Sequence, residues 1–534
     1  TNFLSAQGHQ QIPSEKPKLI IEIVLDDARY DDLVRFRNKY CEGGFKRLME
    51  EGTFCYNANF NFMLTQSAPG YATISTGSNP SDHGIIADSW YLRLRGKRIN
   101  ATDDDNVKTI GGGGSIGRHS PRNLTVSTLG DELKLASHSK SKVIGISIKP
   151  DAAILLTGHR ANEAYWYDDA TGNWITSSYY TDTLPRWVND FNAKKMADIY
   201  LNHVWEPLLP ASDYTESLPD DNKYETGING KHTFPYPLNN LSKIKDKYTN
   251  YEMLKYTPFG NTYTKDMAIA AIANENLGKG DNPDLLTVNF STMSYINEKY
   301  GNNSVEMEDT YLRLDKDLEH FIHFIDDNLG KENTLIVLTS DHGEASVPAY
   351  LADMNLPVDY FNANNAIALL KSYLNVVYGK GDWVKFYNNR QIYLNHNLIE
   401  DSKISLKEMQ EKVAQFIIQF SGVANVITAS TLQTTNFTRG IAEKMQNSYN
   451  QKYSGDVLIN LQAGWIEKDG KITSGNSPYS YDTHVPLIWY GWKIKRADIA
   501  MPVDMTDIAP TLSSFLNIAF PNSCSGNPIL KLME

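Results

Sequence analysis

Four residues of the chain have the chemistry needed to bind a divalent metal ion and to carry out nucleophilic attack. Asp26 follows one apolar segment, Asp341 and His342 follow another, and Ser67 lies in the segment TQSAPGYATISTG. Carboxylates and an imidazole suit zinc, and three protein ligands leave a position open for water or substrate. A metal-bound hydroxyl is partly deprotonated near neutral pH, which would make Ser67 a usable nucleophile. The simpler interpretation is that both aspartates only cap helices.

The segments that must position these residues have the composition of buried strands. They are rich in β-branched and other apolar residues without polar alternation, as in strands that are covered on both faces. Four such segments are predicted: Lys18–Leu25, Lys142–Ile148, Leu285–Phe290 and Thr334–Glu344. Helical segments lie between them, so we expect an α/β fold with a doubly wound, mostly parallel sheet between helices. In such sheets ligands bind beyond the carboxyl ends of the strands, where Asp26, Lys149 and Asp341 fall.

Composition excludes several classes of protein. The 534 residues include 51 Lys and Arg against 63 Asp and Glu, which gives a formal net charge of −12. An acidic chain without a block of Lys and Arg is a poor candidate for binding nucleic acid through its phosphates. No segment approaches the roughly 20 apolar residues of a membrane span. We therefore expect neither a nucleic acid partner nor a membrane-spanning segment, which leaves small molecules and other proteins as partners.

Two long stretches have weaker periodicity than the rest of the chain. Residues 160–265 and 345–475 are rich in Tyr, Trp, Asn and Gly, and we interpret them as insertions that form a cap. The prediction is one α/β domain over residues 18–534, preceded by an N-terminal extension at 1–17. Because the chain begins with Thr1 rather than Met, we expect that a secretion signal has been removed.

Several of these motifs together resemble the alkaline phosphatase superfamily, and within it the phosphate-irrepressible PafA-type alkaline phosphatases of Bacteroidota. They include VLDDARYDDLVRF, SAPGYATISTGSNPSDHGIIADSWY, TSDHGEASVPAYL and YDTHVPLIWYG, in family order. The resemblance implies an alkaline-phosphatase-like α/β sheet, a two-zinc site, and a Thr or Ser nucleophile that forms a covalent phospho-enzyme. It also implies export, and thus a periplasmic or extracellular location.

The resemblance implies that one zinc ion is held by Asp26, Asp341 and His342 with the nucleophile Ser67. All four positions are chemically intact.

The other zinc site departs from the family pattern. The resemblance assigns His484 to it, together with two positions of the motif STMSYINEKYG that hold Ser294 and Glu298 instead of Asp and His. Glutamate can ligate zinc, but a neutral serine hydroxyl is a poor replacement for a carboxylate. We therefore expect one zinc ion, and a second site that is weak or absent.

The substrate-holding positions also depart from the family. The resemblance places Asp88 where the family has Asn, and Asp151 where it has Arg, while Lys149 is retained. Transfer of a dianionic phosphoryl group relies on cations around its oxygens, and two acids in their place repel such a substrate. We expect poor activity on simple phosphate monoesters.

Two interpretations of this divergent site stay open. In the first, the chain hydrolyses a phosphate- or sulfate-type ester through Ser67 with one dominant metal, and Asp88 or Asp151 faces a cationic group of the substrate. In the second, it is a pseudoenzyme that uses its insertions to bind a protein partner or to assemble. The first is preferred because the remaining residues form a coherent set for one metal and one oxyanion.

Overall fold

The computed structural model describes residues 15–244, 248–468 and 470–534. Its central sheet has 11 strands. In order across the sheet they are β22 (Ala497–Ile499), β2 (Thr53–Asn59), β21 (His484–Gly491), β14 (Thr334–Ser340), β1 (Leu19–Leu25), β13 (Asp284–Phe290), β6 (Val143–Ser147), β7 (Glu163–Asp168), β8 (Asn173–Ser177) and β5 (Thr109–Ile110), with β23 (Val503–Asp504) paired to β2. The five strands β14, β1, β13, β6 and β7 run parallel to one another.

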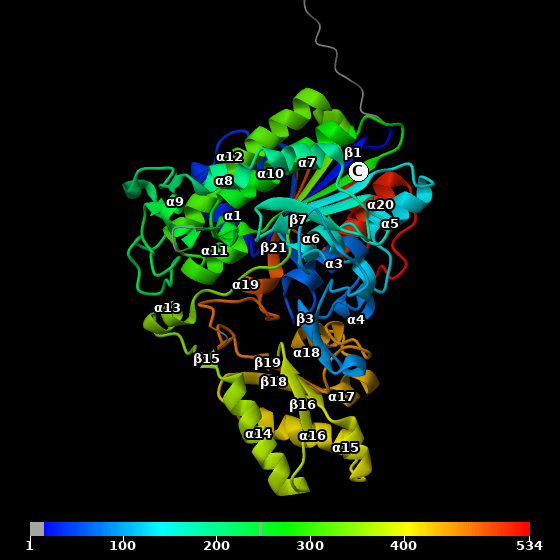
Figure 1. Ribbon diagram of the computed structural model, residues 1–534. Coiled ribbons are helices and arrows are strands. Elements are labelled where there is room, and N and C mark those ends of the chain that lie inside the picture. The colour runs from blue at the N-terminus through cyan, green and yellow to red at the C-terminus, as the bar shows by residue number, and fades with distance from the viewer. Residues whose placement is uncertain (1–14, 245–247, 469) are drawn as a thin grey trace, which may run out of the picture.

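Helices cover both faces of this sheet. Alternate side chains of β1 enter two different hydrophobic cores, as expected for a strand that is buried on both faces. On one face lie α10 (Phe259–Glu275) and α12 (Val305–Asn328); on the other lie α3 (Ser67–Thr76), α5 (Leu129–Ala136) and α20 (Ile508–Leu516). The predicted doubly wound, mostly parallel α/β sheet is confirmed (Figure 1).

A second lobe contains its own sheet and its own core. Figure 1 shows it below the main body, in yellow. Its four strands are β16 (Val384–Asn388), β17 (Gln391–Leu394), β19 (Val457–Leu461) and β18 (Val423–Thr428), and they pack against α14 (Ala363–Tyr378) and α16 (Leu406–Ile417). This lobe falls within the predicted insertion at 345–475.

The insertion predicted at 160–265 has a different character. Strand β7 pairs in parallel with β6, and β8 pairs antiparallel with β7, so both strands extend the central sheet. The start of this stretch therefore belongs to the sheet rather than to a cap. In the chain, the short helix α6 (Pro150–Leu155) connects β6 to β7.

Within the described residues, no helix is both long and apolar enough to cross a membrane.

Strand β1 contains one acidic residue, Glu22, in otherwise apolar surroundings. Glu22 is buried, and neither of its carboxylate oxygens has a hydrogen-bond partner among the described residues. Burial raises the pKa of Glu22 to about 8, against an ordinary value of 4.5. The folded state thus binds a proton that the unfolded state releases, so stability falls as pH rises from 4.5 to 8.

We expect Glu22→Gln to remove this part of the pH dependence. The wild-type chain should lose up to about 5 kcal/mol of unfolding free energy across that range from this group alone, whereas the amide cannot ionise. Urea unfolding at several pH values between 5 and 9 measures the effect. Parallel pH profiles for the two proteins would show that Glu22 does not carry the buried proton.

Candidate active site

Asp26 lies directly beyond the end of β1, at the centre of the sheet, and is fully buried. Its Oδ2 is 2.7 Å from Nζ of Lys149, which follows β6. Its Oδ1 accepts hydrogen bonds from the Tyr71 hydroxyl at 2.5 Å and from Nδ2 of Asn289 at 2.6 Å. Residues from the ends of two other strands and from one helix therefore converge on this carboxylate, as the rule for parallel sheets predicts.

Asp341 lies beside Asp26 because β1 and β14 run parallel, with Leu25 opposite Ser340. Its Oδ1 accepts from the backbone amides of Asp27, at 3.0 Å, and His342, at 2.8 Å. Its Oδ2 is buried and accepts no hydrogen bond from the described part of the chain. Burial, together with the neighbouring carboxylates, raises the pKa of Asp341 to about 7. A buried oxygen without a donor is what a metal ligand leaves when no ion is present.

His342 presents one ring nitrogen to these acids. Its Nδ1 lies 2.6 Å from the Gly343 carbonyl oxygen and therefore donates to it, which leaves Nε2 facing the site. Nε2 is 3.6 Å from Oδ2 of Asp341 and 3.3 Å from Oδ1 of Asp27. Burial opposes the charge of this imidazole, but the two carboxylates raise the pKa of His342 to about 9.

Ser67 begins α3, the helix that also supplies Tyr71. Nζ of Lys149 lies 3.4 Å from Oγ of Ser67, so one ammonium group contacts both this hydroxyl and Asp26. The helix can approach the strand ends because Gly70 has no side chain: a Cβ there would lie 2.1 Å from the Asp341 carbonyl oxygen. The structure thus brings the predicted nucleophile to the predicted metal ligands.

The two acids predicted on the substrate side also lie here. Oδ1 of Asp88 accepts from the backbone amide of Ala68, next to Ser67, at 2.8 Å. The Asp151 carboxylate accepts from the Thr102 hydroxyl, and burial raises its pKa to about 7, an effect that the charge of Asp88 reinforces.

The residues assigned to a second zinc ion have other partners. Ser294 donates to Oδ2 of Asp26 at 3.4 Å and to the Ser291 carbonyl at 2.9 Å. Glu298 forms an ion pair with Lys471. At the first position of β21, Nε2 of His484 donates to the Tyr56 carbonyl at 2.8 Å, and its ring stacks on Tyr30 at 4.6 Å. Glu298 and His484 thus each have a protein partner, and their assignment to a second zinc ion stays a prediction.

Two further acids, which sequence reasoning missed, belong to the site. Ligand atoms of Asp27, His342 and Glu344 all lie within 4.8 Å of one another, and all three residues are buried. Asp27 has a φ of 55°, a left-handed conformation that aspartate tolerates better than most residues. Their positions in the sequence could have indicated them, because Asp27 directly follows Asp26 and Glu344 is two residues after His342.

The side chains of Asp26, Asp341 and His342 offer donor atoms that fit a divalent ion such as zinc. Carboxylates and one neutral imidazole are its usual oxygen and nitrogen ligands, and Oδ2 of Asp341 lacks a hydrogen-bond donor among the described residues.

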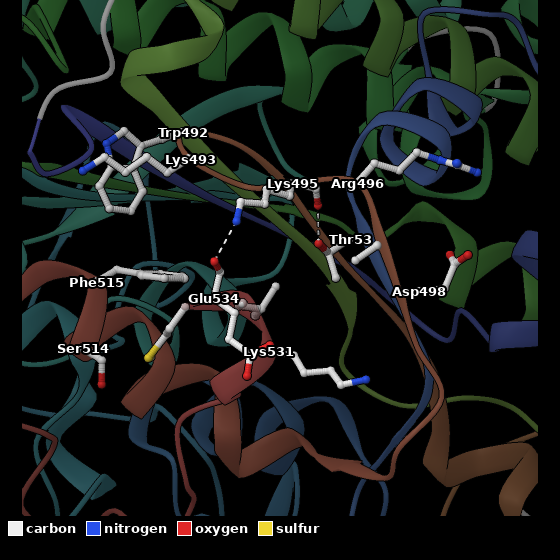
Figure 2. Close-up of a pocket in the computed structure, with 13 residues that line it drawn as sticks. Thr53, Trp492, Lys493, Lys495, Arg496, Asp498, Ser514, Phe515, Lys531 and Glu534 are labelled. Carbon is white, nitrogen blue, oxygen red and sulfur yellow. Dashed lines mark hydrogen bonds between the residues drawn. The ribbon is translucent and has the colours of Figure 1, made fainter.

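A separate surface pocket contains none of the predicted site residues. Its volume is about 920 Å³, and its lining includes Trp492, Phe515, Lys495 and Glu534 (Figure 2). Nζ of Lys495 points toward Glu534 and donates to its backbone oxygen at 2.6 Å.

Comparison with known proteins places the chain in a family. Residues 20–483 match the family model described as type I phosphodiesterase / nucleotide pyrophosphatase. The chain is 41% identical to the "Calcium-transporting ATPase" of Myroides odoratus, over 97% of this chain and 95% of that protein. It is 38% identical to alkaline phosphatase PafA of Elizabethkingia meningoseptica, over 100% of this chain and 97% of that protein. The crystal structure of wild-type PafA aligns with a TM-score of 0.92, at 38% identity, over 98% of this chain and 100% of that one. The chain therefore belongs to the type I phosphodiesterase / nucleotide pyrophosphatase family and, within the alkaline phosphatase superfamily, to its PafA-type members.

Proposed function

We propose that the protein is a metal-dependent phosphoester hydrolase that uses Ser67 as its nucleophile. The observation that carries this proposal is the position of Ser67 Oγ, 3.4 Å from an ammonium group that also contacts Asp26. Relatives that span the full chain and are named alkaline phosphatases support the class of reaction.

Asp26, Asp341 and His342 would hold one zinc ion, which supplies Lewis acidity when it is bound and lowers the pKa of a neighbouring hydroxyl. In the reaction, Oγ of Ser67 forms a bond to phosphorus while the bond from phosphorus to the leaving ester oxygen breaks, and the proton of the Ser67 hydroxyl is released and balanced by protonation of the departing alcohol. Lys149 lies beside Ser67 and stabilises the negative charge that develops on the transferred group. Water then attacks phosphorus: its oxygen stays on phosphorus, the bond between phosphorus and Oγ breaks, and one proton of the water restores the Ser67 hydroxyl.

The surroundings of Ser67 favour a substrate with less negative charge than a phosphate monoester. Asp88 lies beside the nucleophile, and Asp151 adds a second carboxyl group. A monoanionic diester or sulfate ester, or an ester that carries a cationic group, suits these acids better than a dianion does. A panel of phosphate monoesters, phosphate diesters and sulfate esters, assayed with zinc-loaded protein, tests this preference.

A binding protein without catalysis remains the second candidate. The ion pair between Lys149 and Asp26 favours it, because an ammonium group already neutralises one of the predicted zinc ligands. If no ester of the panel is cleaved, this second candidate becomes the better account.

We expect the double variant Asp88→Asn, Asp151→Arg to increase kcat/KM for an aryl phosphate monoester by at least about tenfold, since it replaces two acids with an amide and a cation. The matched control is a monoanionic phosphate diester, for which the same variant should change kcat/KM much less. An unchanged monoester rate would show that these acids do not face the substrate.

A further inference from the structure

The turn between β16 and β17 of the second lobe reaches the segment that contains the predicted nucleophile. Asn389 lies in this two-residue turn, with a φ of 48°. Its Nδ2 donates to the Ser89 carbonyl oxygen at 2.7 Å, and its Oδ1 accepts from Nε2 of Gln66 at 3.2 Å. One side chain of the lobe therefore contacts both the residue before Ser67 and the residue after Asp88.

Gln66 connects this turn to Asp88. The Gln66 side chain is buried; its Nε2 donates to Asn389, and its Oε1 accepts from the backbone amide of Asp88 at 2.7 Å. The Asp88 carboxylate accepts in turn from the Ala68 amide at 2.8 Å, so the hydrogen bonds close a ring around Ser67. Because both ends of the Gln66 carboxamide are bonded, loss of either partner frees the group to rotate.

A second contact holds the turn in place. The next residue, Arg390, has a φ of 57°, in the left-handed region that residues other than glycine and asparagine rarely adopt. Its side chain is buried, and its guanidinium donates to the Asn476 carbonyl oxygen. The Asn476 amide donates to the carbonyl of Thr65, two residues before Ser67, at 3.1 Å. Backbone strain of this kind persists only where the surrounding contacts fix it, and it is most frequent at functional sites.

We propose that Asn389 is a positioning residue for the reaction: through Gln66 it fixes Ser67 and Asp88 relative to each other, so that the second lobe determines the geometry of attack. A displacement of about 1 Å at a reacting group can cost about 100-fold in rate. This inference deepens the proposed function and rests on it for the role of Ser67. The contacts exist without a substrate, so they can be tested independently of the hydrolase assay.

The kinetic test compares the wild type, Asn389→Gly and Asn389→Asp as whole chains acting on the best ester substrate. Glycine suits a φ of 48°, so Asn389→Gly keeps the turn and removes both side-chain hydrogen bonds. We expect it to lower kcat at least about tenfold and to change KM less than about twofold, since the contact affects the attack rather than substrate binding. Asn389→Asp keeps an acceptor for Gln66 and should remain close to the wild type in kcat.

Asn388→Ala is the matched control. Nδ2 of Asn388 donates to the same Ser89 carbonyl oxygen, also at 2.7 Å, and its removal leaves the bond from Gln66 to Asn389 in place. This variant should keep the wild-type kcat. A double-mutant cycle tests the route: if Asn389 acts through Gln66, adding Asn389→Gly to Gln66→Ala should lower kcat no further than Gln66→Ala does alone.

Amide hydrogen exchange, resolved at single residues, tests the same contacts without a substrate. The Asp88 amide should exchange at least about fivefold faster in Asn389→Gly than in the wild type or in Asn388→Ala. A wild-type kcat in a folded Asn389→Gly, or unchanged exchange of the Asp88 amide, would overturn the proposal. If no ester is cleaved, the hydrolase function fails, and the exchange rate still decides whether Asn389 positions Asp88. If Asn389→Gly does not fold, Asn389→Ser, whose hydroxyl lies one atom closer to the backbone, takes its place in both measurements.

Discussion

Ser67→Ala is expected to lower kcat for the best ester substrate by at least about 10³-fold, because it removes the atom that attacks phosphorus. Zinc affinity and thermal stability should change little. The Ser67 hydroxyl accepts a hydrogen bond of 3.4 Å from Lys149, and so long a bond contributes about 1 kcal/mol or less to folding. Steady-state kinetics, calorimetric zinc binding and thermal unfolding of the same preparation separate these effects.

Two controls match this change. Ser67→Thr keeps a hydroxyl at the same position and should retain turnover. Ser294→Ala removes another buried hydroxyl close to Asp26 but leaves the nucleophile, and should also remain active. If Ser67→Ala keeps the wild-type rate, whatever activity the protein has does not pass through this residue.

Asp341→Asn is expected to lower zinc affinity by at least about 100-fold, beyond the 10- to 100-fold effect of changing residues outside the ligand shell. The amide oxygen can still accept hydrogen bonds from the Asp27 and His342 amides, so the local fold should persist. What the variant loses is the negative charge and the buried Oδ2, which has no hydrogen-bond donor within the described residues.

The measurement is zinc retention after dialysis against a competing chelator, together with kcat. Asp82→Asn, at an acid of α4 (Pro80–His83) outside the site, is a suitable control and should retain its metal. Equal zinc affinity in Asp341→Asn and the wild type would remove Asp341 from the ligand set.

The sequence was sufficient to predict the central strands and the residues directly beyond their ends. An uninterrupted apolar run such as that before Asp26 has few alternatives to a buried strand, and parallel strands bring their ends together. Asp27 could not be predicted in the same way, because its side-chain direction depends on a left-handed φ of 55°. Lys471 lies in a segment without periodicity, and only the three-dimensional fold brings it to Glu298. His484 lies in a family motif; in the structure it donates to the Tyr56 carbonyl and stacks on Tyr30, and its role as a zinc ligand stays a prediction.

The pairing of β1 has a consequence for how the chain is made. The hydrogen bond from the Asp27 amide to Asp341 joins residues 314 positions apart, and the partner strands of β1 begin only at Asp284 and Thr334. During synthesis the first strand therefore leaves the ribosome long before either neighbour exists, with its backbone groups unpaired and its apolar side chains exposed. Until then an emerging chain of this kind is open to aggregation, and the predicted ligands Asp26, Asp341 and His342 can come together only after translation has passed His342.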